Sequence, residues 1–163
     1  MRVVSDTSPI SNPAIIGRLD FLKQRYGEVR IPDAVAQEIA LMTRIDAKKS
    51  FEAAVMDGWV VKWANPPAHL SRTDRAFLGL GETAAIDLAL DSKADLLLMD
   101  EKRGREVARR HGLIAGGLLG ELLHAKQREW ISNLKGEILR LRTEARFFIS
   151  AEIERLILKE AGE

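Results

Sequence analysis

The feature that most constrains this chain is an uninterrupted apolar run that ends in a carboxylate. Residues 95–99 read Asp-Leu-Leu-Leu-Met, and Asp100 follows directly. An apolar run without polar alternation is typical of a strand that is buried on both faces, which requires helices on both sides of a parallel sheet. The chain is therefore predicted to be an α/β protein with this strand inside its sheet.

Other strand-like runs alternate with helical patterns along the chain. Further strands are expected at residues 2–5, 28–31, 59–61 and 113–115. Helices are expected at residues 14–22, 32–39, 45–56, 82–91, 103–111 and 118–126, with two more around 134–141 and 153–157. Strands separated by helices favour parallel pairing. We expect a three-layer α/β/α sandwich with a central, mostly parallel sheet and a C-terminal helical hairpin.

The length of the chain and its lack of cysteine exclude several classes of protein. With 163 residues the chain can bury a core without disulfides or a structural metal, so we expect a single domain over residues 1–163 with its core in about the first 130. The absence of cysteine excludes a disulfide scaffold, a thiol nucleophile and an iron–sulfur cluster. The three histidines, His69, His111 and His124, lack the spacing of a metal site.

Charge and hydropathy point to a cytoplasmic protein without a bulk preference for nucleic acid. Twenty-five Lys and Arg residues balance 24 Asp and Glu residues, so binding to nucleic acid would need a local basic patch. Asp6 interrupts the N-terminal apolar stretch, and the glycine-rich uncharged run at residues 112–120 is too short to cross a bilayer. We therefore expect no contact with a membrane.

Four acidic residues occupy positions that this fold would bring together. Asp6 and Asp100 follow two predicted strands, Glu38 borders the sheet-facing stripe of helix 32–39, and Glu82 begins helix 82–91. Ligands of open α/β sheets bind outside the carboxyl ends of the strands. We call these four residues the acidic quartet and expect them near one edge of the sheet.

Each member of the acidic quartet also has a simpler explanation. Glu82 and Asp100 could cap helices, Glu38 could lie on the surface, and Asp6 could form an Asx turn. On the helix that Glu82 begins, Asp87 and Asp91 are expected to face solvent, because neither shares its face.

Bringing four carboxylates together requires a cation. Two like charges about 4 Å apart repel by roughly 4 kcal/mol at an effective dielectric constant near 20. Oxygen ligands without soft donors select Mg²⁺ or Mn²⁺. One or two such ions would activate a water molecule and neutralise the transition state of phosphodiester cleavage.

Basic residues crowd the helix that follows Asp100. This basic strip consists of Lys102, Arg103, Arg105, Arg109 and Arg110. A nucleic-acid backbone beside an acidic metal site would need such residues for its neighbouring phosphates. The alternative is a solvated helix face paired with Glu101 and Glu106. Three tryptophans, Trp59, Trp63 and Trp130, are expected in the core rather than stacked on bases.

The ordered set of acids and its surrounding motifs resemble the PIN-domain family of metal-dependent ribonucleases, over nearly the whole chain. The segments that carry this resemblance are Val4–Pro9, Ile31–Pro32 with Val35–Ile39, Leu80–Ile86 and Asp95–Glu101. A poorly characterised prokaryotic subgroup is resembled by Gly104-Arg105, Gly116–Gly120, Ala125-Lys126 and the terminal Ala-Gly-Glu.

The resemblance implies roles for particular residues. The catalytic and metal-binding acids would be Asp6, Glu38, Glu82 and Asp100, with Asp6 and Asp100 as the principal ligands. A hydroxyl group near the first acid falls on Thr7 or Ser8. The third acid is often Asp in related toxins, so Glu82 is a departure, and Gly117 stands where the subgroup often has Thr. The adjacent Glu101 leaves open whether it or Asp100 binds the metal.

The resemblance also implies a function. Many compact prokaryotic PIN proteins are toxins of type II toxin–antitoxin pairs, which dimerise and are covered by a small antitoxin. The expected protein is therefore a homodimeric endoribonuclease that uses Mg²⁺ or Mn²⁺ to hydrolyse RNA. The alternative is a degenerate PIN-like module that only binds RNA or a protein. Phosphatases of the haloacid dehalogenase class are disfavoured, because they need a second Asp where Ser8 stands.

Overall fold

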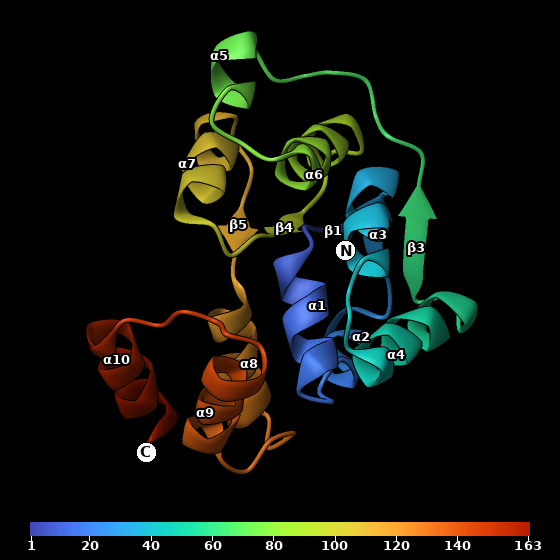
Figure 1. Ribbon diagram of the computed structural model, residues 1–163. Helices are drawn as coiled ribbons and strands as arrows, with labels where there is room; N and C mark the ends of the chain where they lie inside the picture. Colours follow the sequence, from blue (N-terminus) through green and yellow to red (C-terminus); the bar gives the residue numbers. More distant parts are fainter.

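Five parallel strands form one sheet in the computed structural model, which describes residues 1–163 (Figure 1). The strands are β1 (Val3–Ser5), β2 (Val29–Pro32), β3 (Val60–Trp63), β4 (Leu96–Leu98) and β5 (Ala115–Gly116). Their order across the sheet is β3-β2-β1-β4-β5, and every pair of neighbours is parallel. The parallel sheet predicted from the sequence is confirmed.

The strand order reverses between β1 and β4. From β1 the chain builds the sheet outward through β2 to β3, and then returns to add β4 and β5 on the other side of β1. Ser5 lies opposite Leu98, so the two central strands end at the same level. The position where the strand order reverses is where open α/β sheets bind their ligands, outside the carboxyl ends of the strands.

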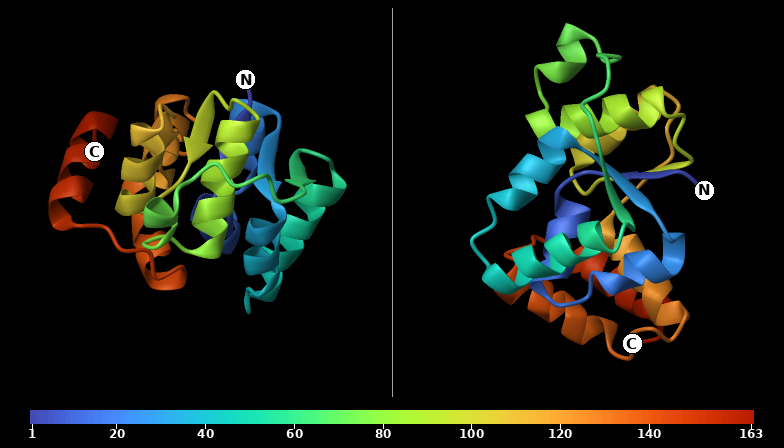
Figure 2. Two further views of the ribbon diagram at one scale, coloured as in Figure 1. Left: turned by 90° about the horizontal axis from the view of Figure 1, so that it is seen from above. Right: turned by 90° about the vertical axis from the view of Figure 1, so that its right-hand side faces the viewer.

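Helices cover both faces of the sheet, as two perpendicular views show (Figure 2). One face carries α6 (Leu80–Asp91) and α7 (Lys102–Arg110), with the short α5 (Arg72–Arg75) beyond them. The opposite face carries α1 (Ser8–Ile15), α2 (Asp20–Tyr26), α4 (Ile45–Met56), α8 (Leu118–Gln127) and α9 (Leu134–Glu144). Helix α3 (Asp33–Ala40) packs against α6, and α10 (Ala151–Ala161) packs against α8 and α9. The architecture is the predicted three-layer α/β/α sandwich.

The predicted helix over residues 14–22 is two helices. Helix α1 starts earlier, at Ser8, and ends at Ile15, and α2 starts at Asp20. Gly17 lies between them with a φ of +68°, a conformation that favours glycine and stops a helix. Pro9 occupies the first turn of α1, and Pro13 lies inside the helix.

The prediction that Asp87 faces solvent is wrong. Its side chain is buried and accepts hydrogen bonds from the backbone N–H groups of His69 (2.8 Å) and Leu70 (3.0 Å). Arg75 Nη2 lies 2.5 Å from its second oxygen. Helix α6 therefore buries a second face beneath the segment that connects β3 to α6. Asp91 is exposed, as expected.

Two of the three tryptophans are not in the core. Trp59 is buried, but Trp63 is 42% exposed and Trp130 is 36% exposed. Trp63 is the last residue of the edge strand β3, where the guanidinium of Arg30 lies 5.0 Å from its ring centroid. An edge strand has no neighbour to cover such a side chain. No helix in the protein is both long and apolar enough to span a bilayer.

The buried Asp87 network should be important for stability. We expect Asp87→Ala to lower the free energy of unfolding by about 3 kcal/mol, because it removes a buried charge pair and leaves two N–H groups without an acceptor. Urea denaturation measures this change. Asp91→Ala, on the exposed side of the same helix, is the matched control: it removes only a solvent-exposed contact with the His69 ring (3.0 Å) and should change stability by less than about 1 kcal/mol. Equal effects of the two substitutions would contradict this role.

Candidate active site

Asp6 directly follows β1, next to β4, at the point in the sheet where the strand order reverses. Its backbone N–H donates a hydrogen bond to the carbonyl of Leu98 on β4 (2.9 Å), which holds it against the sheet. The residue is only 5% exposed. Burial, and to a smaller extent the charges of Glu82, Glu38 and Asp100, raise the pKa of its carboxyl group to about 7, against a hydrogen bond from the Thr7 backbone that lowers it. Asp6 is therefore the centre of the acidic quartet.

Asp100 lies beside Asp6 because β4 ends level with β1. Its Oδ2 accepts a hydrogen bond from the Ser8 hydroxyl (2.6 Å), and its Oδ1 accepts one from the backbone N–H of Leu118 (2.7 Å). Burial raises the pKa of Asp100, while these two donors and the charge of Arg105 oppose the shift. Asp100 thus connects the first turns of α1 and α8 at the end of the sheet.

Glu38 reaches the same region from α3. One carboxylate oxygen accepts a hydrogen bond from the backbone N–H of Gly81 (2.9 Å), and the other accepts one from the Thr7 hydroxyl. A β-carbon at Gly81 would lie 2.5 Å from Glu38 Oε2, so only glycine allows this close approach. Glu38 is exposed, as the simpler reading of the sequence held, yet its charge still acts on Asp6.

Glu82 both caps its helix and faces the other acids. Its Oε1 lies 3.4 Å from the backbone N–H of Gly79 in a capping box at the start of α6. Burial raises its pKa, the Gly79 hydrogen bond and Arg103 lower it, and the charges of Glu101 and Glu38 raise it. The capping role weighed from the sequence is confirmed, and it does not remove Glu82 from the acidic quartet.

The structure brings the acidic quartet together but does not pre-arrange it around one metal position. The mutual charge effects on Asp6 show that the other three acids approach it from separate elements. No group of three or more acidic or histidine side chains is spaced to hold an ion as the side chains stand. An all-oxygen donor set fits a hard divalent cation in its chemistry. Binding one would require carboxylates to exchange hydrogen bonds for the metal.

Asp100 and Glu101 differ in their surroundings. Asp100 points into the site and acts on Asp6, whereas Glu101 is exposed at the start of α7. A β-carbon at Gly117 would lie 3.0 Å from Asp100 Oδ1 and 3.4 Å from Arg105 Nη1. Glycine at this position therefore leaves room for the Asp100 carboxylate, and a threonine would press on it.

The members of the basic strip have different environments. Lys102, Arg103 and Arg109 are exposed along α7, and the Arg103 guanidinium lies 5.1 Å from the ring centroid of Phe77. Arg110 is paired with Asp74 (2.7 Å).

Arg105 differs from the rest of the basic strip. It is half-buried and donates to the backbone carbonyls of Met99 (3.1 Å) and Asp100. It stabilises the turn that presents Asp100, a role that the sequence analysis missed, because only the fold shows which carbonyls lie within its reach.

The raised pKa of Asp6 predicts a pH-dependent stability in metal-free buffer. The folded protein holds the Asp6 proton up to a pH of about 7, whereas the unfolded chain releases it near 3.8, so stability should fall as the pH rises between these values. Asp6→Asn removes this loss and should raise the free energy of unfolding at pH 8 by up to about 4 kcal/mol.

Thermal unfolding in EDTA from pH 4 to pH 8 measures this effect. Asp57→Asn, at an exposed position in a separate part of the chain, is the control and should follow the wild-type pH profile. A strongly destabilised Asp6→Asn variant would instead assign Asp6 a structural role.

Comparison with known proteins supports one family. A family model described as a PIN domain matches residues 2–163. Searches of curated proteins and of solved structures each returned no match. PIN domains are generally nucleases that bind nucleic acids and typically use divalent metals. With its sheet, its reversal of strand order and its converging acids, the chain belongs to the PIN-domain family.

Proposed function

We propose that this protein is a metal-dependent endoribonuclease that hydrolyses RNA phosphodiester bonds. The observation that carries the proposal is the buried Asp6 carboxyl group, whose pKa is raised to about 7 by burial and by three other acids at the end of the sheet. Because like charges repel, grouping four acids disfavours their ionised forms. A bound divalent cation would instead favour the ionised forms. Perturbed carboxylates of this kind are typical of functional sites.

In this proposal Asp6 and Asp100 are the principal ligands of one or two Mg²⁺ or Mn²⁺ ions, with Glu82 and Glu38 completing the site. The bound metal would supply activation of water and neutralisation of charge on the phosphate. Ser8 and Thr7 orient Asp100 and Glu38 through their hydroxyl groups. One acid of the quartet accepts the proton of the attacking water.

RNA would approach along α7. Lys102, Arg103 and Arg109 present exposed cationic groups beside the acidic quartet, where they can bind phosphates that flank the cleaved bond. Arg105 contributes positive charge, but its Nη1 group already donates hydrogen bonds to the backbone carbonyls of Met99 and Asp100. We therefore assign it mainly to positioning Asp100, and we assign phosphate binding to its exposed neighbours.

We further propose that the protein acts in the cytoplasm as a homodimeric toxin with a small antitoxin partner. Support for this comes from the resemblance of its motifs to compact prokaryotic PIN proteins. The second candidate function is a degenerate PIN-like module that binds RNA or a protein without cleaving it. It is favoured by the hydrogen bonds that already engage the carboxylates of Asp100 and Glu38.

Divalent cations should stabilise the protein through the acidic quartet. At a metal concentration of 100 Kd, Mn²⁺ should add about 2.7 kcal/mol to the free energy of unfolding, which raises Tm by several degrees. The shift should be lost in Asp6→Asn and Asp100→Asn and kept in Asp57→Asn. Thermal melts with EDTA and added Mn²⁺ or Mg²⁺ measure it. A Tm that no divalent ion moves would argue against a metal site.

Cleavage of RNA separates the two candidate functions. With Mn²⁺ or Mg²⁺ present, the wild-type protein should cut single-stranded RNA, and EDTA, Asp6→Asn or Asp100→Asn should reduce the rate to background. Gel analysis of a labelled RNA measures this, with Asp57→Asn as the active control. RNA binding without cleavage in any divalent metal would favour the binding module, and cleavage that persists in both variants would indicate a contaminating nuclease.

A further inference from the structure

A hollow of about 330 Å³ borders the acidic quartet on the side of the C-terminal helices. One wall contains Asp100, Arg105 and Gly117, at the end of β4 and the start of α8. The other wall is the connection between α9 and α10, including Phe147 and Phe148, and the first turns of α10. The volume lies at the lower end of the range for small-ligand sites and suits one nucleoside.

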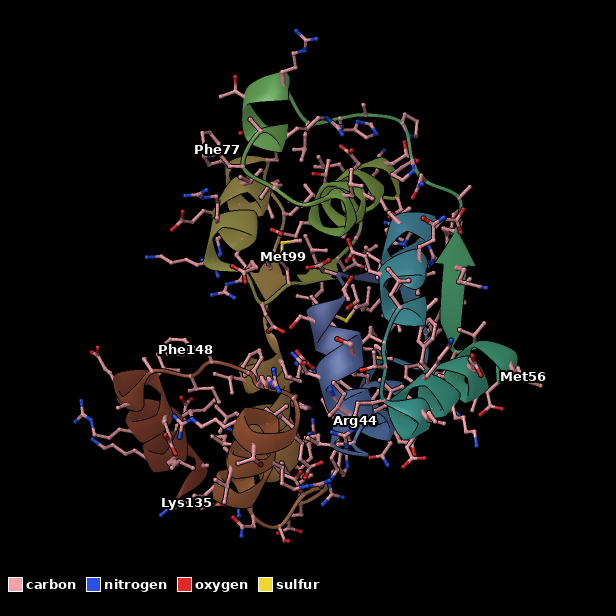
Figure 3. All side chains as sticks on the ribbon, in the orientation of Figure 1. Arg44, Met56, Phe77, Met99, Lys135 and Phe148 are labelled. Atoms are coloured by element: carbon pink, nitrogen blue, oxygen red, sulfur yellow. The ribbon has the colours of Figure 1, made fainter.

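Phe148 is the most unusual side chain of this wall. It is 87% exposed, although the neighbouring Ile149 is buried in the core. In Figure 3 it stands away from the body of the protein, between α10 and α7. Phe148 also lines a second, shallower hollow with Arg142 and Arg146. An aromatic ring that borders two hollows and is hardly covered by protein has room for a flat partner.

The charges around Phe148 favour an anionic partner. Arg146 is exposed, makes no ion pair and has a φ of +53°, a conformation uncommon outside glycine. On the other side of the ring the hollow contains Arg105. Arg142 is less available, since it is paired with Glu154 (2.5 Å) and donates to the carbonyl of Ile149 (2.9 Å). Exposed aromatic rings with nearby arginines are typical of sites for single-stranded nucleic acid.

We infer that this hollow receives an unpaired nucleobase of the substrate, stacked on Phe148, next to the phosphate that a metal bound at Asp100 would hold. Phe148 is thus a specificity-determining residue for single-stranded RNA, and Arg146 binds the following phosphate. This inference rests on the proposed function and adds to it a position that binds one base of the substrate. A base already stacked in a duplex cannot enter the hollow, so single strands are the favoured substrate.

The position of the hollow distinguishes a nucleobase from an apolar side chain of a protein partner. Asp100 lines the hollow and also faces Asp6, so an occupant lies within one nucleotide of the metal-binding acids. The walls combine apolar surface with Arg105 and the Ser150 side chain, which suits a ring with polar edges and an attached phosphate.

The test compares RNA binding by variants that separate stacking from apolar contact. Fluorescence anisotropy of a short, labelled single-stranded RNA in EDTA measures affinity without cleavage. Phe148→Ala and Phe148→Leu should each weaken binding about tenfold, whereas Phe148→Trp should bind as tightly as the wild type, because only an aromatic face stacks on a base. A duplex of the same sequence should bind more weakly and be insensitive to all three changes.

Met56→Ala is the matched control, because Met56 is 88% exposed on α4 and lies on the other side of the molecule from Phe148 (Figure 3). Its RNA affinity should equal that of the wild type. Single-strand affinity that is unchanged in Phe148→Ala would overturn the inference. A leucine variant that binds RNA as well as the tryptophan variant would also overturn it, because apolar contact without an aromatic face would then be sufficient.

The inference and the proposed function fail in different ways. If the wild-type protein cleaves RNA with Mn²⁺ but Phe148→Ala leaves its kcat, KM and choice of cleavage site unchanged, the stacking site is wrong and the nuclease assignment stands. If Phe148-dependent binding is found without cleavage in any divalent metal, the stacking site stands and the nuclease assignment is wrong. Melting curves of each variant verify that it is folded.

Discussion

The parallel pairing of β1 with β4 is the constraint on which the site depends. Both strands are short and fully buried, and their register aligns Ser5 with Leu98. Since the chain extends the sheet away from this pair in both directions, the residues that follow the two strands have open space above them. Asp6 and Asp100 occupy that space. Apolar burial, which stabilises the sheet, thus determines where the charged groups must lie.

The residues around the acidic quartet compensate for much of the cost of holding the carboxylates there. Hydroxyl groups of Thr7 and Ser8 and backbone N–H groups of Gly81 and Leu118 donate to Glu38 and Asp100. Fewer donors stabilise the Asp6 carboxylate: burial and the neighbouring acids raise its pKa to about 7, and only the hydrogen bond from the Thr7 backbone lowers it. Hydrogen bonds therefore hold the outer carboxylates in place, while the ionised form of the central Asp6 is disfavoured. This arrangement is expected where a cation is to be bound.

Sequence patterns predicted elements well where one physical requirement dominated. The apolar run before Asp100 required a strand buried on both faces, and the helix at residues 45–56 followed directly from its periodicity. Predictions failed where two requirements competed. Asp87 looked solvent-facing by helical spacing, but the segment before α6 covers that face and places Arg75 against it. Trp63 looked like a core residue by its type, but it lies on an edge strand.

By itself the sequence determined the α/β class and the strand ends that carry Asp6 and Asp100, because these follow from local hydrophobic pattern. It also predicted, from residue chemistry, the four acids of the quartet. Only the tertiary structure decided that Glu38 lies against Gly81, that Arg105 binds backbone carbonyls, and that Phe148 is left uncovered beside Asp100. The physical reason is that such contacts join residues from different elements. Their distances depend on how helices pack across the sheet, which no local pattern encodes.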